Sequence, residues 1–200
     1  MNILTLTLGP LGTNCYLVWN EGAKQAVVID PAAKPQTICD ALQARGLTLA
    51  AILLTHAHFD HIGALKPLHA ATGAPIYLGE ADRDDPSKLC YDYLTYTDLC
   101  RDGDVIEASG LRFLVHATPG HTPGSVSYLC ETTLFSGDTL FAGSYGRTDF
   151  PGGSGAQLLS SLRRLSALDG KTRVLPGHGE ETTIEQERRV NPGMREAMRG

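Results

Sequence analysis

The feature that most restricts the fold is a run of six apolar residues, 49–54, which ends directly at a cluster of histidines. Six residues are too few to cross a bilayer. A short apolar run without polar alternation is typical of a strand buried in a sheet, and we predict such a strand over 51–54. The heptapeptide THAHFDH over 55–61 then lies on the loop at the end of this strand, where functional residues are often found.

The spacing within this heptapeptide indicates two neighbouring metal positions. His56 and His58, two residues apart in an extended segment, point the same way. Asp60 and His61 follow after the chain turns, so they can face a second metal close to the first. A solvated polar loop explains the segment less well, because adjacent histidines and a carboxylate at a strand end serve no packing purpose.

Three later loops repeat one pattern, a metal-competent side chain beside a glycine at the end of a predicted strand. They carry His121 within 118–125, Asp138 within 135–139 and His178 within 175–179. The glycines allow the tight backbone turns that such loops need. Together with the loop over 55–61, they make four loops that place metal-competent side chains at the ends of strands, and this favours a metal centre. His69, inside a predicted helix, and His116, near the end of a predicted strand, have no adjacent glycine and are interpreted as structural.

Composition agrees with an ordinary globular protein. Of 200 residues, 42% are hydrophobic and 20% charged, which suits a single domain over 1–200 with a full core. The net charge of −5 argues against a nucleic-acid surface, and neither a membrane span nor a signal peptide is predicted. Five widely spaced cysteines without a CxxC pair argue against a disulfide framework and favour a reducing, cytoplasmic location.

Strand and helix signals alternate along the chain. Strands are predicted over 3–8, 15–19, 26–29, 51–54, 75–78, 104–107, 111–116, 125–130, 132–135 and 173–175. Helices are predicted over 35–45 and 61–71, after a capping pair at Ser154 and Gln157, and after a second pair at Thr182 and Glu185. Residues 80–103 carry no clear signal, and 141–155 form a glycine-rich loop. This order suits sheets that are covered by helices on their outer faces.

The set of loops resembles the motifs of the metallo-β-lactamase superfamily between residues 55 and 178. The resemblance implies an α/β (α+β) fold, a four-layer αββα sandwich with its site at the sheet edges. It also implies a ligand set: His56, His58 and His121 for a first metal, Asp60, His61 and His178 for a second, and Asp138 as the bridge.

All of these ligands offer nitrogen or oxygen atoms. The expected cofactors are therefore two divalent metal ions, Zn²⁺ first, with Fe²⁺ and Mn²⁺ chemically acceptable. Asp60 and Asp138, the carboxylates of the set, are the expected catalytic residues. Asp30, at the end of a predicted strand, either orients a ligand histidine from behind or is an acidic turn residue.

Within the superfamily, the chain looks like the short single-domain bacterial members of the glyoxalase II (hydroxyacylglutathione hydrolase) branch. The stretches FAGSYGRTDFPGG over 141–153 and ERRVNP over 187–192 carry this resemblance. The short stretch after the last ligand predicts that the C-terminal helical glutathione-binding domain is absent. Where that branch places a Lys and a Tyr for glutathione, this chain has RTD over 147–149. Arg147 is the candidate substrate-binding residue, and pairing with Asp149 is its alternative role.

The resemblance implies a binuclear metallohydrolase that cleaves a small-molecule thioester, S-lactoylglutathione or another hydroxyacylglutathione, with neither nucleic acid nor a membrane as partner. A thiolate, with a pKa of about 8.5, departs without a general acid, whereas a lactam nitrogen is a poorer leaving group. The alternative is a mononuclear iron persulfide dioxygenase, because that group shares a Gly-Arg-Thr-Asp stretch similar to 146–149. A lactone or ester hydrolase of the same superfamily is a third possibility. A metal-free binding module is disfavoured, because every ligand position is present.

Overall fold

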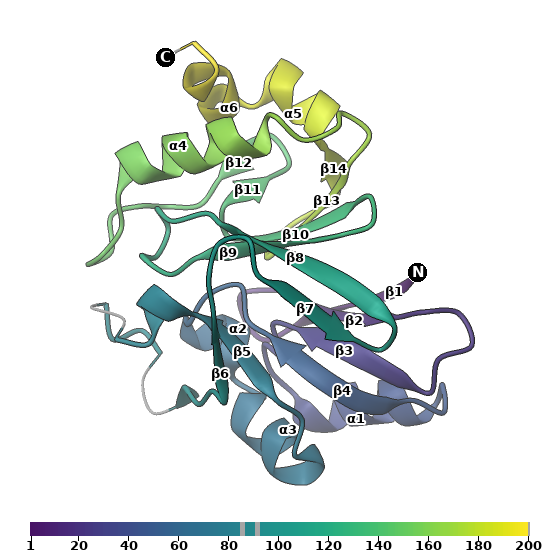
Figure 1. The fold of residues 1–200 in the computed structure, drawn as a ribbon. Helices are drawn as coiled ribbons and strands as arrows, with labels where there is room; N and C mark the ends of the chain where they lie inside the picture. Colours follow the sequence, from purple (N-terminus) through teal and green to yellow (C-terminus); the bar gives the residue numbers. More distant parts are fainter. Residues whose placement is uncertain (85–86, 91–92, 200) are drawn as a thin grey trace.

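The computed structural model describes residues 1–84, 87–90 and 93–199. In this part of the chain, two six-stranded sheets pack face to face, and helices cover the outer face of each sheet (Figure 1). The predicted four-layer αββα sandwich is therefore confirmed.

The first sheet comes from the N-terminal half of the chain. Its strands lie in chain order: β1 (Asn2–Leu8), β2 (Thr13–Trp19), β3 (Gln25–Ile29), β4 (Thr48–Leu53), β5 (Ile76–Gly79) and β6 (Asp98–Cys100). The first three strands pair antiparallel, and β3 to β6 pair parallel, so longer connections return the chain between them. Among these connections are α1 (Pro35–Gln43), α2 (Phe59–Ile62) and α3 (Leu65–Thr72).

The second sheet comes from the C-terminal half. Its order is β14 (Thr182–Thr183), β13 (Arg173–Pro176), β10 (Thr133–Gly137), β9 (Val126–Cys130), β8 (Leu111–Ala117) and β7 (Val105–Ala108). Only β10 and β13 pair parallel in this described sheet. Its outer layer contains α4 (Gly155–Leu165), α5 (Ile184–Val190) and α6 (Pro192–Ala197).

Three apolar layers hold the sandwich together. In β3, Val28 packs with the helices of the first outer layer, whereas Val27 and Ile29 face the second sheet. Alternate residues of a strand point to opposite faces, so a strand covered on both sides has to be apolar throughout. Phe135 lies in the layer between the sheets, and Leu162 of α4 lies in the layer above the second sheet. This double burial explains the unbroken apolar run at 49–54.

The predicted helix over 61–71 is wrong as a continuous element. The structure has two helices, α2 and α3, with Gly63 and Ala64 between them. Pro67 explains the break, because it has no N–H to donate to the carbonyl of Gly63 one turn earlier. A glycine is also required at 63, since a Cβ there would clash with the carbonyl oxygen of Ala32.

The C-terminal region also differs from the prediction. Thr183 rather than Thr182 caps α5, with its hydroxyl accepting the backbone N–H of Gln186 at 3.2 Å. A further helix, α6, begins at Pro192 and is capped by Asn191. A proline fits the first turn of a helix, so it marks a helix start here as well as the end of α5.

Two stretches without a prediction contain regular structure. The glycine-rich loop includes a small hairpin, β11 (Leu140–Phe141) and β12 (Ser144–Tyr145). Residues 80–103 contain a 3₁₀ helix, η1 (Glu80–Asp82), and strand β6, while 85–86 and 91–92 lie outside the described residues.

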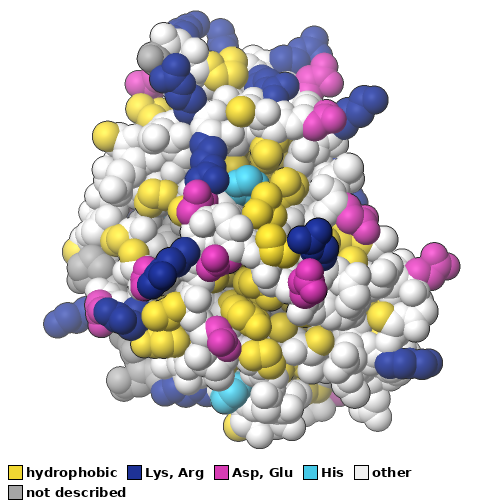
Figure 2. All heavy atoms as spheres, viewed as in Figure 1, with side chains coloured by type: hydrophobic (Ala, Val, Ile, Leu, Met, Phe, Trp, Pro, Cys, Tyr) yellow, Lys and Arg dark blue, Asp and Glu magenta, His cyan; other side chains and the backbone are white. Residues whose placement is uncertain are grey.

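Acidic and basic side chains are interspersed on the face shown in Figure 2, with hydrophobic side chains between them. Ion pairs at the surface of the molecule include Arg101 with Glu80 and Arg164 with Asp102, each at 2.6 Å. Within the described residues, the helices are too short or too polar to span a membrane.

Candidate metal centre

The direction of the strands explains why distant residues meet. β3, β4 and β5 run parallel, and β8 runs in the direction of β10 because both pair antiparallel with β9. Backbone hydrogen bonds of 2.8 Å, from Val126 to Thr55 and from Asn14 to Gly177, join the two sheets near these strand ends. The loops after β4, β8, β10 and β13 bring together all the residues predicted as ligands: His56, His58, Asp60, His61, His121, Asp138 and His178.

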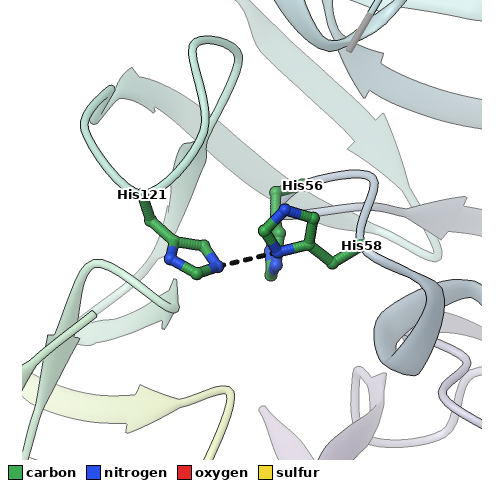
Figure 3. Close-up of side chains that lie close together, drawn as sticks. All are labelled: His56, His58 and His121. Carbon is green, nitrogen blue, oxygen red and sulfur yellow. Dashed lines mark hydrogen bonds between the residues drawn. The ribbon is translucent and has the colours of Figure 1, made fainter. Parts of the chain in front are cut away.

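The first group consists of His56, His58 and His121, all buried. Figure 3 shows the three rings pointing toward one another from two different loops, with His58 Nδ1 2.9 Å from His121 Nε2. The three ligand atoms lie within 4.8 Å of one another. Three imidazole nitrogens that converge in this way form a site that suits Zn²⁺, Fe²⁺ or Mn²⁺.

The second group consists of Asp60, His61 and His178. Asp60 Oδ2 lies 3.2 Å from His178 Nε2 and 3.5 Å from His61 Nε2. Asp138 lies between the two groups, with its oxygens 3.4 Å from His61 Nε2 and 3.6 Å from both His121 Nε2 and His178 Nε2. A carboxylate in this place can contact two cations at once.

Buried polar atoms without partners test whether these residues fit a metal. His56 Nε2, His61 Nε2 and Asp138 Oδ1 are buried and accept or donate no hydrogen bond among the described residues. Buried polar groups are rarely left in this state unless something satisfies them. The donor set of nitrogen and oxygen atoms fits divalent metal ions, so the centre and the expected cofactors agree.

Other protein groups form hydrogen bonds with the ring nitrogens of His61 and His121 that face away from the centre. His61 Nδ1 lies 2.8 Å from Asp30 Oδ2, and His121 Nδ1 lies 2.8 Å from the backbone oxygen of Arg147. Asp60 Oδ2 accepts a 2.9 Å hydrogen bond from the hydroxyl of Thr13. Such contacts fix the tautomer and orientation of a ligand. For Asp30, the structure has the contact expected of an orienting residue.

The charges in the cluster shift its protonation equilibria in opposite directions. Burial, together with the neighbouring His61 and His58, holds the pKa of His56 well below its ordinary value. Burial opposes the charged form of His61 too, but the carboxylates of Asp138 and Asp30 raise its pKa well above the ordinary value. A hydrogen bond with Asp60 raises the pKa of His178. Uncharged His56 therefore presents a free nitrogen lone pair to a cation.

At position 177, next to the candidate ligand His178, only glycine fits sterically. A Cβ at this position would clash with Asp138 Oδ1 and would lie 2.7 Å from His61 Cε1. The glycine lets the backbone that carries His178 pass directly beside the centre. The sequence signal of glycine-flanked loops therefore reports close approach of the backbone to the site.

Asp82 is a residue of this region that the sequence analysis missed. It lies in η1, is fully buried, and accepts hydrogen bonds from Ala57 N at 3.0 Å, Thr122 Oγ1 at 2.8 Å and Gly124 N at 2.6 Å. Ala57 stands between His56 and His58, and Thr122 follows His121 in the chain. Asp82 thus ties together the two loops of the first group. The only sequence signal is an acidic residue shortly after a predicted strand.

Arg147 has a defined partner at the rim of the centre. Its guanidinium donates two hydrogen bonds of 2.6 and 2.7 Å to the carboxylate of Asp149 and lies 3.9 Å from the ring centroid of Phe150. Both charged side chains are exposed. The structure thus has the contact expected for the alternative role of Arg147, while its side chain stays accessible to solvent.

The ERRVNP stretch holds the hairpin that leads to Arg147. Glu187 accepts the backbone N–H of Gly143 at 2.8 Å, and Asn191 Nδ2 donates to the carbonyl of Ser144 at 2.7 Å. Both Glu187 and Asn191 are buried. The stretch therefore positions the loop between Asp138 and Arg147, without contributing a side chain to the cluster of candidate metal ligands.

The two histidines interpreted as structural lie outside the cluster. His69 lies in α3, and its Nδ1 is 2.9 Å from the carbonyl oxygen of Ala74. His116 lies in β8, where burial and the nearby Arg164 lower its pKa. Neither belongs to a group of candidate ligands among the described residues.

A four-layer αββα sandwich with a cluster of His and Asp side chains at one edge defines a class of metal-dependent enzymes. A family model described as the metallo-beta-lactamase superfamily matches residues 8–178. The chain belongs to this superfamily, whose members bind divalent metal ions.

Two of the relatives that cover nearly the whole chain are named as hydrolases. The hydroxyacylglutathione hydrolase GloC of Haemophilus influenzae is 34% identical and the alignment covers 96% of this chain and 97% of that protein. The probable metallo-hydrolase YqgX of Bacillus subtilis is 36% identical, with 94% of each chain covered. The family and these hydrolase relatives identify the chain as a metallohydrolase.

Solved structures from several branches superpose closely. The B3 metallo-beta-lactamase BLEG-1 has a TM-score of 0.89 at 39% identity, covering 96% of this chain and 99% of that one. ETHE1 from Myxococcus xanthus has a TM-score of 0.86 at 35% sequence identity, and the match covers 96% of this chain and 84% of that one. TTHA1623, solved in a di-iron-bound form, has a TM-score of 0.82 at 40% sequence identity, and the match covers 94% of this chain and 98% of that one.

Proposed function

We propose that this chain is a binuclear metal-dependent hydrolase that cleaves the thioester bond of S-lactoylglutathione or of another hydroxyacylglutathione. The observation that carries the proposal is the position of Asp138 between the two groups of candidate ligands, where it also forms a third, overlapping group with His56 and His61. A centre for one metal needs only one of these groups. The similarity to GloC supports the class of substrate.

The ligand roles belong to the same proposal. His56, His58 and His121 would hold one metal, Asp60, His61 and His178 would hold the other, and Asp138 would serve both. Metals bound there supply Lewis acidity and activate water at neutral pH. Zn²⁺ is the first candidate, and the di-iron-bound TTHA1623 makes iron the second.

The protein's own residues orient this chemistry. Asp30 accepts the Nδ1 proton of His61, so that Nε2 faces the centre, and the Arg147 carbonyl does the same for His121. Thr13 holds Asp60 by its Oδ2. Asp60 and Asp138 are the proposed catalytic carboxylates, because they alone in the cluster bring negative charge against the reacting centre. A thiolate leaving group needs no separate acid.

The proposed substrate is a small intracellular molecule. No disulfide joins the five cysteines, all of which lie within the described residues, and this supports a reducing, cytoplasmic location. Arg147, the exposed cation beside the centre, is the proposed contact for a carboxylate of the thiol carrier.

The second candidate function is a mononuclear iron persulfide dioxygenase. The Gly-Arg-Thr-Asp stretch over 146–149 favours this candidate, because it resembles a stretch of the persulfide dioxygenases. Lactone or ester hydrolysis is the third. The second group of ligands, Asp60, His61 and His178, argues for the binuclear hydrolase over the single-iron enzyme.

One preparation can separate these functions. We expect elemental analysis to give more than one equivalent of divalent metal, and S-lactoylglutathione to release free thiol that a disulfide dye detects. A β-lactam serves as the control substrate, because BLEG-1 carries the name of a β-lactamase. One equivalent of iron together with oxygen uptake on a persulfide would contradict the proposal.

A further inference from the structure

A cavity of about 230 Å³ opens beside the second group of ligands, between the β1–β2 loop, the segment after β3, and α2. Asp60 and Thr13 line it, and these two side chains are joined by the 2.9 Å hydrogen bond described above. Asp60 therefore belongs both to the lining of the cavity and to the second group of candidate ligands. Drug-sized ligands occupy pockets of roughly 300–1,000 Å³, so this cavity suits one arm of a substrate.

The walls of the cavity are apolar. Among the described residues that line it, only Thr13, Asp60 and Tyr93 carry a polar side-chain atom, and none carries a positive charge. Pro10, Leu11, Ala33 and Phe59 provide much of the remaining surface. An acyl group with its own carboxylate would find no cation among these described lining residues and would meet the negative charge of Asp60.

Two large side chains at the cavity are exposed. Leu11 is 56% exposed and Tyr93 is 50% exposed. Exposed apolar surface next to a functional site is expected where a ligand covers it. A second cavity, of about 220 Å³, lies near β6 and the 117–126 loop, and none of the candidate ligands lines it.

The two ends of the metal centre differ in chemistry. At the end of His121 stand the polar side chains of Arg147 and its partner Asp149, with the guanidinium of Arg147 over the ring of Phe150. At the end of Asp60 stands the apolar cavity. A thioester whose carbonyl lies at the centre has two arms, a polar thiol carrier and an acyl group, and each arm matches one end.

We propose that the cavity beside Asp60 receives the acyl arm, and that the preferred substrates are thioesters, hydroxyacyl thioesters included, whose acyl chain continues beyond the length of lactoyl as unbranched hydrocarbon. This inference rests on the proposed thioester hydrolysis. Burial of one methylene contributes about 0.8 kcal/mol, which corresponds to about 4-fold in affinity or kcat/KM. Each added methylene is expected to raise kcat/KM by up to this factor until the cavity is full.

The test compares acyl chains on a constant carrier. The metal-loaded enzyme is given S-lactoyl-, S-acetyl-, S-butyryl- and S-hexanoylglutathione, and kcat/KM is measured for each. Calorimetry of acetate, butyrate and hexanoate binding gives a second series that needs no turnover. We expect both series to rise with chain length.

Two variants connect the series to the cavity. Ala33→Leu fills it, and Leu11→Ala removes an exposed wall, so both should lower the ratio of hexanoyl to acetyl kcat/KM by at least about 4-fold. Val105→Ala is the matched control, because Val105 is a 42% exposed apolar residue on β7, outside the cavity, and should leave the ratio unchanged.

The outcomes distinguish a failure of the acyl-cavity proposal from a failure of the proposed thioester hydrolysis. Thioester cleavage with a flat chain-length series, or a rising series that neither Ala33→Leu nor Leu11→Ala changes, overturns the acyl cavity and leaves the thioesterase intact. No thioester cleavage, with carboxylate affinity that rises with length and is lost in the variants, overturns the thioesterase and supports the cavity. No cleavage and flat binding overturn both.

Discussion

His61 Nδ1 lies 2.8 Å from Asp30 Oδ2, although 31 positions separate the two residues in the chain. The other oxygen of Asp30 accepts the backbone N–H of Thr55 at 2.8 Å, so one buried carboxylate positions both the ring and the start of the histidine loop. Asp30 has a φ of 50°, in the left-handed region that few residue types other than glycine, Asn and Asp adopt readily.

Replacing Asp30 with Asn should weaken metal binding. Asn tolerates the left-handed backbone but has one acceptor oxygen, which cannot serve both His61 and Thr55. Loss of such an outer contact typically costs 10–100-fold in metal affinity, roughly the change expected in a chelator-competition titration of Asp30→Asn. Asp40→Asn, an exposed change on α1, is the control. Equal affinities for the two variants would show that Asp30 does not position His61.

Asp82→Asn should disturb the first group of ligands. Asp82 accepts three hydrogen bonds with two oxygens, and Asn leaves at least one buried donor unsatisfied. The free energy of unfolding should fall by about 1–3 kcal/mol, which corresponds to roughly 2–12 °C in Tm for a chain of this size. Metal binding should weaken as well. Asp102→Asn is the matched control, because Asp102 accepts the backbone N–H of Ala117 and pairs with Arg164 at the surface. A lower Tm with unchanged metal affinity would limit Asp82 to a structural role.

Asp138→Asn should affect both metals. As the carboxylate between the two groups, Asp138 offsets positive charge from each, and the neutral amide would not. We expect lower metal content and a fall in kcat of roughly 100-fold or more. His69→Ala and His116→Ala should change stability at most, since neither lies in the cluster. Loss of metal in His116→Ala but not in Asp138→Asn would refute the ligand set.

Arg147→Ala separates a substrate contact from a loop contact. If Arg147 binds a substrate carboxylate, KM for S-lactoylglutathione should rise roughly 10–150-fold at unchanged metal content, as expected for loss of a charged hydrogen bond. Asp149→Ala frees the guanidinium from its present partner and should leave KM equal or lower. A lower Tm and lost metal with unchanged KM would assign Arg147 to the shape of the loop.

Removal of the metals should lower the stability of the fold. A ligand that binds only the folded chain stabilises it by RT ln(1 + [L]/Kd), about 2.7 kcal/mol at 100 times Kd. Calorimetry should therefore give a lower Tm after chelation, and added Zn²⁺ should restore it. The shift should be smaller in His178→Ala, which lacks one ligand of the second group. An unchanged Tm on chelation would argue against tight binding.

Local signals predicted those parts of the fold that depend on neighbours in the chain. Apolar runs marked strands such as β4, because burial on both faces leaves no room for polar residues. The signals failed where one residue type serves two purposes. Pro192 both ends α5 and begins α6, and the break between α2 and α3 depends on one missing N–H at Pro67. η1 is too short to have a periodic pattern.

The sequence by itself determined which side chains are candidates for the metal centre, because HxHxDH and the glycine-flanked His and Asp residues stand directly after strands. Only the tertiary structure decided how they meet: strand direction in two packed sheets brings the loops after β4, β8, β10 and β13 to one edge. The contacts of Asp30 and Asp82, and the partner of Arg147, were decided there as well. A hydrogen bond between residues far apart in the chain depends on the packing of whole elements, which no local pattern encodes.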